Sequence, residues 1–261
     1  MADLDYRVDS GIATITLNRP ARKNAFTLKM IDAWVSVLRQ AGSDPEVRVV
    51  VLTGAGDAFC SGVDLRRGVS GPPETPIARK LMLSERVHQI PLAMEDLDKP
   101  VIAAINGVAV GAGLDMALMC DIRIMARSAR VSEGYIRVGM VPGDGGCYYL
   151  PRLVGVAKAL ELLWTGDFVS SEEAERIGLV NSVVEDSQLA EVTTALARKI
   201  ADAHPMAIRM IKRATYQSLR SDLRTSLDLI SSHTGVIGLM ADSQEAREAF
   251  AEHRRPRFTG K

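Results

Sequence analysis

The feature that most constrains the fold is a regular alternation of short apolar segments with helical ones. Residues 12–17 alternate apolar and small polar side chains, and residues 47–53, 101–105 and 122–126 are short buried-type strands. Between the first two, residues 27–41 repeat apolar side chains at helical spacing behind a threonine suited to cap a helix. Strands separated by helices in this order predict an α/β domain with mainly parallel crossovers.

The pattern changes near residue 187 and is helical almost to the end, apart from breaks such as His204-Pro205. We therefore predict a core domain over residues 1–187 and a helical C-terminal region over residues 188–261. Residues 67–76 are rich in Gly and Pro and lack periodicity, which predicts a surface loop.

Charge and hydropathy exclude several classes of partner. Lys plus Arg and Asp plus Glu both number 32, so no field of a single sign is available to hold a nucleic acid. The first residues, MADLDYRVDSG, are acidic where a signal peptide is basic, and no apolar run approaches the roughly 20 residues of a membrane span. We expect a cytoplasmic protein that binds neither nucleic acid nor membrane.

Cysteine and histidine usage gives no sign of a metal or disulfide framework. Cys60, Cys120 and Cys147 are odd in number and widely spaced, without a CxxC pair. They are expected to be reduced thiols in small, mostly apolar niches. No cluster of His, Asp or Glu has the spacing of metal ligands, so no metal is expected.

Two glycine-containing turns follow predicted strands, at residues 58–65 (AFCSGVDL) and 106–115 (NGVAVGAGLD). Small residues let ligand atoms approach backbone N–H groups, and a helix beginning there favours an anion. Each turn taken alone could equally be a close-packed turn without a ligand. Gly111-Ala112-Gly113 lacks the full G-x-G-x-x-G spacing and the downstream acid, so a dinucleotide site is not predicted.

Taken in order, these segments resemble the crotonase (enoyl-CoA hydratase/isomerase) superfamily along nearly the whole chain. The matching segments are Asn18-Arg19-Pro20 with Asn24-Ala25, AFCSGVDL, KPVIAAINGVAVGAGLDMALMCDIR, VGMVPGDGG and GLVNSVV. The resemblance implies a crotonase-like (ClpP/crotonase) fold of repeated ββα units with a helical C-terminal trimerisation region. It also implies an acyl-CoA substrate, no cofactor apart from the coenzyme A of that substrate, and a homotrimer or homohexamer.

The same resemblance assigns binding roles to residues of the two turns. It implies an oxyanion hole made by the backbone N–H groups of Val63 and Ala112, which would stabilise negative charge on a thioester oxygen. The adenine and pantetheine groups of coenzyme A would lie along Arg22, Lys23, Ala25, Ser61, Asp64 and Leu65. Arg22 and Lys23 could face the CoA phosphates, although solvated surface charge explains each of them as well.

The acid–base residues depart from the family pattern. Hydratases of the family use two glutamates, and this chain has Asp115 at the first position and Tyr135 at the second. A phenol with a pKa of about 10 is a weak base near pH 7, which puts the two-carboxylate hydration mechanism in doubt. Asp144 offers a replacement carboxylate. Asp115 and Asp144 could shuttle a proton between carbons of an enolate if one of them is held protonated.

Other readings of these residues and of the function stay open. Tyr135 could donate a hydrogen bond to substrate or only pack, Glu133 is nearby but displaced by two positions, and His88 could reach the acyl pocket or be structural. We expect hydration or double-bond isomerisation of an enoyl-CoA or related acyl-CoA, with a slight preference for isomerisation or another enolate reaction because of Tyr135. The alternatives are a hydrolase of a thioester or β-dicarbonyl C–C bond, and a catalytically silent acyl-CoA binder. Related C–C bond hydrolases use several histidines near the site, and this chain has only four in total, which makes the hydrolase less attractive.

Overall fold

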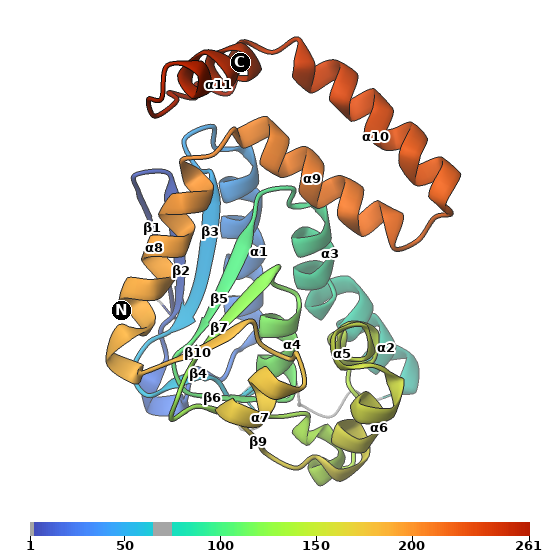
Figure 1. The fold of residues 1–261 in the computed structure, drawn as a ribbon. Coiled ribbons are helices and arrows are strands. Elements are labelled where there is room, and N and C mark those ends of the chain that lie inside the picture. The colour runs from blue at the N-terminus through green and yellow to red at the C-terminus, as the bar shows by residue number, and fades with distance from the viewer. Residues whose placement is uncertain (1–2, 65–74) are drawn as a thin grey trace.

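Two sheets form the centre of the computed structural model, which describes residues 3–64 and 75–261 (Figure 1). The larger sheet has the order β1 (Leu4–Asp9), β2 (Ile12–Leu17), β3 (Val49–Gly54), β5 (Val101–Ile105), β7 (Ile122–Ala126) and β10 (Ser182–Val184). Its strands are parallel except for β1, which pairs antiparallel with β2. The smaller sheet has the order β4 (Ala58–Cys60), β6 (Val108–Val110), β8 (Arg130–Ser132) and β9 (Val169–Ser170).

From β3 to β8, consecutive strands alternate between these two sheets. After each of β3, β5 and β7, the chain passes from the carboxyl end of a long strand into β4, β6 or β8 of the smaller sheet. The smaller sheet therefore crosses the end of the larger one, where ligand sites of parallel sheets are commonly found. This arrangement confirms the predicted fold of repeated ββα units. The strands of the smaller sheet have only two or three residues, too few for a sequence period to reveal them.

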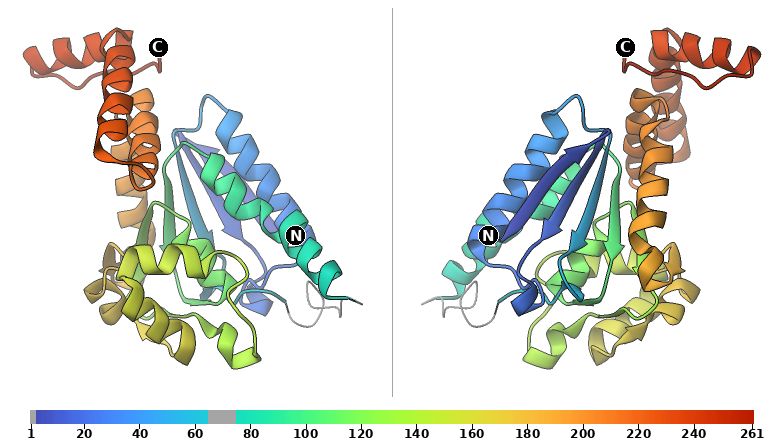
Figure 2. Two further views of the ribbon diagram at one scale, coloured as in Figure 1. Left: turned by 90° about the vertical axis from the view of Figure 1, so that its right-hand side faces the viewer. Right: turned by 90° about the vertical axis from the view of Figure 1, so that its left-hand side faces the viewer.

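Helices cover both faces of the larger sheet (Figure 2). The helical segments are η1 (Pro20–Arg22), α1 (Leu28–Ser43), α2 (Pro76–Met82), η2 (Leu83–Val87), α3 (Gln89–Asp96), α4 (Ala112–Leu118), η3 (Gly134–Val138), α5 (Gly146–Val154), α6 (Val156–Thr165), α7 (Ser171–Arg176), η4 (Asp186–Gln188), α8 (Leu189–Ala201), α9 (Pro205–Ser218), α10 (Leu223–Gly238) and α11 (Ala241–Ala251). The hydroxyl of Thr27 accepts a hydrogen bond from the amide of Met30, which confirms the predicted cap of α1. Helices α1 and α3 lie on one face, and α8 lies on the other.

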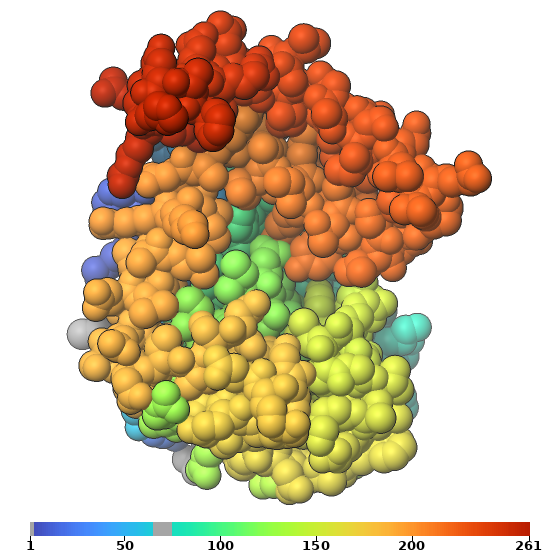
Figure 3. Space-filling model, viewed as in Figure 1, coloured from blue at the N-terminus to red at the C-terminus, as the bar shows by residue number. Residues whose placement is uncertain are grey.

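The helical C-terminal region begins against the core and then leaves it. Helix α8 packs on β3, β5 and β7, whereas α10 buries no residue within the single chain. Figure 3 shows α10 and α11 standing out from the rest of the molecule. Helix α9 is held against the core by Lys212. Its ammonium group donates hydrogen bonds to Asp121 and to the carbonyl of Lys99, at 2.8 Å each. The division at 187/188 and the trimerisation role remain predictions.

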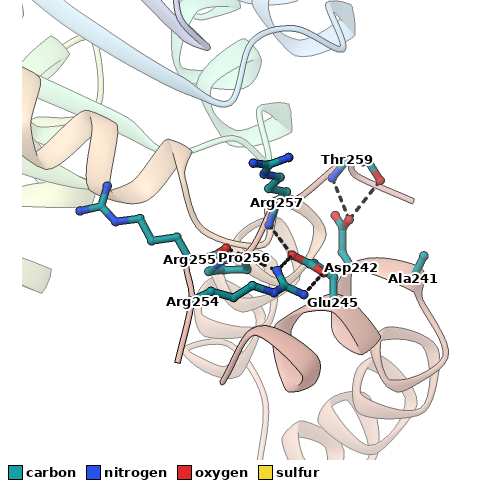
Figure 4. A pocket seen from close by; sticks show the side chains of 8 residues that line it. All are labelled: Ala241, Asp242, Glu245, Arg254, Arg255, Pro256, Arg257 and Thr259. Atoms are coloured by element: carbon teal, nitrogen blue, oxygen red, sulfur yellow. Dashed lines mark hydrogen bonds and ion pairs between the residues drawn. The ribbon is translucent and has the colours of Figure 1, made fainter. Parts of the chain in front are cut away.

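The last residues fold back as a structured tail (Figure 4). Asp242 accepts hydrogen bonds from the amides of Thr259 at 2.7 Å and Gly260 at 2.6 Å, and Glu245 pairs with Arg254. Arg48 of the core donates to the carbonyl of Phe258 at 2.9 Å. A hollow of about 700 Å³ beside these contacts is lined by charged groups, several of which pair with one another. It is distant in sequence from every catalytic residue predicted above.

Two expectations from the sequence are modified by the structure. Cys60 and Cys120 are buried and burial raises the pKa of each to about 12, but Cys147 is exposed in the first turn of α5, so the prediction of a niche is wrong for it. The loop predicted over residues 67–76 lies outside the described residues except for Thr75 and Pro76, which begin α2. Within the described part of the chain, no helix is both long and apolar enough to cross a bilayer.

Gly113 gives a direct test of the close contact between the sheets and α4. A Cβ atom on Gly113 would lie 2.1 Å from the carbonyl oxygen of Cys60, so Gly113→Ala should lower the free energy of unfolding by roughly 3 kcal/mol, the upper end of overpacking costs. Gly42→Ala in α1 is the control, because its Cβ would meet only Leu97 Cδ1 at 3.4 Å. Urea unfolding measures both, and equal stability of the two variants would contradict the contact.

Candidate active site

A phenol joins two buried carboxyl groups at the centre of the molecule. The hydroxyl of Tyr135 in η3 lies 2.6 Å from Asp115 Oδ2 in α4 and 2.8 Å from Asp144 Oδ2 in the loop before α5. Asp115 is fully buried and Asp144 is 3% exposed. One hydroxyl has one proton, so it can donate to only one of these carboxyls at a time. The second contact is favourable when the other carboxyl is protonated and donates in return. The three predicted acid–base residues are therefore brought together.

Backbone constraints hold this group in place. Gly111 precedes α4 with a φ of 53°, and a Cβ there would lie 3.5 Å from the ring of Tyr135, so the ring packs beneath the second turn. The loop that carries Asp144 is held by His88, whose Nε2 lies 2.7 Å from the carbonyl oxygen of Gly143. His88 follows η2, a turn of π-helix, a feature that is frequent at functional sites. In this structure His88 contacts the loop of the acid–base group.

Burial sets the protonation of this group. Burial raises the pKa of Asp115 to about 7, although the hydrogen bond from Tyr135 partly lowers it. Burial also raises the pKa of Asp144, and the hydrogen bond from Tyr135 again opposes the rise. Burial, reinforced by the charges of the two aspartates, raises the pKa of Tyr135 well above its ordinary value. Tyr135 therefore stays neutral and acts as a hydrogen-bond donor, and Asp115 exchanges its proton near neutral pH.

A third carboxyl, Glu133, lies beside this group, although sequence reasoning gave it little weight. Glu133 is 1% exposed, and its carboxyl approaches that of Asp115 around the backbone of Gly146. Glu133 and Tyr135 lie two residues apart, where the chain leaves β8 and enters the 3-10 helix η3. The position of Glu133 two residues before Tyr135 was the signal available in the sequence.

The two glycine-containing turns meet as the resemblance implied. A Cβ on Gly62 would lie 3.6 Å from the amide nitrogen of Ala112, the first residue of α4. The amide of such a residue has no acceptor within its own helix. The bridge between Phe26 and Val63 uses the carbonyl of Gly62 and the amide of Asp64, so the Val63 N–H is directed away from Phe26. The oxyanion role of Val63 and Ala112 remains a prediction.

The residues predicted to line coenzyme A lie on two adjoining segments. The amide of Ser61 donates to the carbonyl of Lys23 at 2.9 Å, which places the first loop beside the first turn. The ammonium of Lys23 pairs with Asp57 at 2.5 Å on the surface, and Arg22 is also exposed. Ala25 is buried. These contacts leave both cationic side chains within reach of solvent at this edge.

Two of these predicted binding residues need separate comment. The carboxylate of Asp64 is buried and forms an ion pair with Arg19 at 2.8 Å, so it is already engaged within the protein. Leu65 lies outside the described residues. Within residues 3–64 and 75–261, no group of three or more His, Cys, Asp or Glu side chains is arranged to hold a metal ion.

Comparison with known protein families decides the class of this site. The model of the enoyl-CoA hydratase/isomerase family matches residues 7–261. The chain belongs to this family. As an enoyl-CoA hydratase/isomerase family member it is an enzyme that acts on acyl-CoA compounds, which confirms the resemblance read from the sequence.

Individual relatives cover almost the whole chain. A 1,2-epoxyphenylacetyl-CoA isomerase of Escherichia coli K12 is 40% identical over 257 residues, and an (E)-benzylidenesuccinyl-CoA hydratase of Thauera aromatica is 38% identical over 256 residues. Each alignment covers 97% of both chains. The crystal structure of an enoyl-CoA hydratase from Bacillus anthracis matches with a TM-score of 0.94 at 35% identity and covers 100% of both chains. These matches confirm the crotonase-type fold.

The raised pKa of Asp115 predicts how pH affects stability. Between about pH 4 and 7 the folded protein binds a proton at Asp115 that the unfolded chain has released, so this group makes stability fall as pH rises through that window. Asp115→Asn removes the titration. Its stability relative to the wild type should improve by about 1–3 kcal/mol between pH 5 and pH 7.5, as measured by urea unfolding. A difference that does not vary with pH would contradict the assignment.

Proposed function

We propose that this enzyme moves the double bond of an enoyl-CoA thioester by proton transfer between two carbons, with Asp115 and Asp144 as the acid–base pair. The observation that carries the proposal is the hydroxyl of Tyr135, which contacts both carboxyls in a buried site. That contact favours a state with one proton shared by the two carboxyls. A shared proton suits a reaction that removes one proton and returns another.

The proposed reaction is balanced within the site. The ionised carboxylate takes the proton from the carbon next to the thioester carbonyl, and the electrons of that C–H bond pass to the carbonyl oxygen as an enolate. The amides of Val63 and Ala112 hold this oxygen, a contribution worth about 3–4 kcal/mol per donor in other enzymes. The protonated carboxyl then donates its proton to the far carbon of the original double bond. Tyr135 can pass a proton between the carboxyls to restore the starting state.

Coenzyme A is part of the substrate in this proposal, and no separate cofactor is required. The phosphates would lie near the exposed cations Arg22 and Lys23, and Ser61 and Ala25 would border the pantetheine arm. Asp64 would act indirectly, because its ion pair with Arg19 fixes the segment beside Val63. Leu65 is proposed as a further contact from its position in the motif alone.

Hydration is the second candidate, and one observation favours it. The relative from Thauera aromatica carries the name of a hydratase and is 38% identical. Hydration needs a base to activate water, and here the second base position is occupied by a phenol that stays protonated. We therefore rank isomerisation first. Hydrolysis of the thioester or of a β-dicarbonyl C–C bond, and binding without turnover, rank lower.

A panel of CoA thioesters separates these possibilities. The protein is incubated with crotonyl-CoA, a 3-enoyl-CoA and a saturated acyl-CoA, and both the products and free thiol are followed. The proposal requires conversion of the 3-enoyl-CoA into a 2-enoyl-CoA without release of thiol. Addition of water to crotonyl-CoA with no isomerisation would establish a hydratase instead, and free thiol would establish a thioesterase.

Substitutions at the acid–base pair then test the mechanism. Asp115→Asn and Asp144→Asn should each lower kcat by about 10²–10⁴-fold and leave CoA affinity nearly unchanged, because the lost group acts in proton transfer. Tyr135→Phe should cost less, since the carboxyls remain. Full activity of Asp144→Asn together with an inactive Tyr135→Phe would show that the phenol is the second acid–base group.

We also propose that the enzyme assembles as a homotrimer or a dimer of homotrimers through its C-terminal helices. Helix α10 exposes the apolar side chains of Leu223, Leu227, Ile230 and Val236, and Leu239 just beyond it is 92% exposed. Closed symmetry would cover these side chains. Light scattering should give three or six times the mass of one chain, and Leu239→Asp should reduce that mass. A stable wild-type monomer at micromolar concentration would refute the proposal.

A further inference from the structure

Glu133 has no role in the mechanism above, although it lies deep in the same site. Both of its carboxyl oxygens, and Oδ1 of Asp115, lack a hydrogen-bond partner among the described residues. These three oxygens surround Gly146, where a Cβ would lie 2.6 Å from Asp115 Oδ1 and 3.1–3.2 Å from the oxygens of Glu133. The other oxygen of Asp115 is already bound by Tyr135. The free sides of the two carboxyls therefore face each other.

Among the described residues, the surroundings offer these two carboxyls no cationic partner. Asp115 on α4 is influenced by Tyr135 on η3, by Asp144 and by the amide of Gly146, and Glu133 is influenced by Asp115, Asp144 and the thiol of Cys147 on α5. His88, beside α3, acts on Asp144. No lysine or arginine is among these groups. Two facing carboxylates without a cation are very costly when buried, so at least one of the pair must carry a proton.

Geometry favours Glu133 as the group that carries this proton, because the Tyr135 hydroxyl lies 2.6 Å from Asp115 Oδ2, whereas neither oxygen of Glu133 has a hydrogen-bond partner among the described residues. Burial is the main cause that raises the pKa of both groups, but the contact between them raises the pKa of Glu133 and lowers that of Asp115. A hydrogen bond does this when Glu133 is the donor and Asp115 the acceptor, because it stabilises the acid form of one and the anion of the other. A neutral carboxylic acid of this kind can act as a hydrogen-bond donor at neutral pH.

We propose that Glu133 is a positioning residue that, as a protonated acid, donates a hydrogen bond to Oδ1 of Asp115. Asp115 is then held from two sides by neutral donors, with Glu133 on one oxygen and Tyr135 on the other. This arrangement fixes the direction of the carboxylate and keeps it available as a base at neutral pH without a buried cation. The inference rests on the proposed role of Asp115 in proton transfer.

Two substitutions of similar size separate a donor from a space-filling side chain. Glu133→Gln keeps an N–H donor for Asp115, whereas Glu133→Leu has none. In Glu133→Leu the midpoint of the rise of kcat/KM with pH should move upward by about one to two pH units. The free energy of one hydrogen bond to a charged group corresponds to a pKa change of this size. Activity near pH 7 should fall by about 10–100-fold and recover as the pH is raised. Glu133→Gln should retain most of the activity and the wild-type pH profile.

The opposite results would overturn the inference. Equal loss of activity in both variants would mean that the carboxylic acid of Glu133 has a role other than donating a hydrogen bond to Asp115. Equal retention of activity would mean that Glu133 only fills space. Failure of Glu133→Leu to recover at high pH would indicate a structural defect, and its melting temperature is measured beside the kinetics to support that reading.

A measurement without substrate keeps this inference separate from the proposed function. The infrared C=O stretch of protonated carboxyl groups is recorded at pH 7 for the wild type and for Glu133→Gln. Loss of one protonated carboxyl in the variant supports the donor assignment even if the 3-enoyl-CoA is not a substrate. An unchanged band overturns the assignment even if isomerisation is confirmed.

Discussion

The packing of Gly113 against the carbonyl of Cys60 is the contact on which the site depends. It presses the start of α4 onto the end of β4, so that the amide of Ala112 lies beside Gly62 and Asp115 points toward Tyr135. A side chain at either glycine would separate the turns. The close contact between Gly113 and Cys60 therefore sets both the position of the proposed anion-binding amides and the direction of the Asp115 carboxyl.

The acid–base group places several ionisable side chains together deep inside the protein. Three carboxyls and a phenol lie together, and no lysine or arginine of the described part of the chain is among the groups that act on them, so protons take the place of cations. Such a cluster lowers stability at neutral pH and is tolerated because a large apolar core surrounds it. Its value is chemical, since a carboxyl such as Asp115, with a pKa of about 7, is suited to take up and release protons near neutral pH.

Much of the fold could be predicted because local sequence controls it. The cap at Thr27 and the period of α1 act within one segment, and the run at residues 12–17 matches β2 residue for residue. The positions of Asp115, Tyr135 and Asp144 followed from motifs, and the structure brings them together. Glu133 was undervalued because a 3-10 turn after β8 brings two neighbouring positions to one site. The ion pair of Asp64 with Arg19 joins residues 45 apart, which no local pattern reveals.

The tail that folds back at the C-terminus constrains how this protein can be handled. The carbonyl of Lys261 accepts a hydrogen bond from the amide of Asp242, and Phe258 and Gly260 are tied to Arg48 and Asp242. A purification tag or fluorescent fusion attached after Lys261 would therefore begin at a docked carbonyl rather than at a loose end. Fusions placed before Asp3 leave these contacts intact and are the better choice for labelling the enzyme.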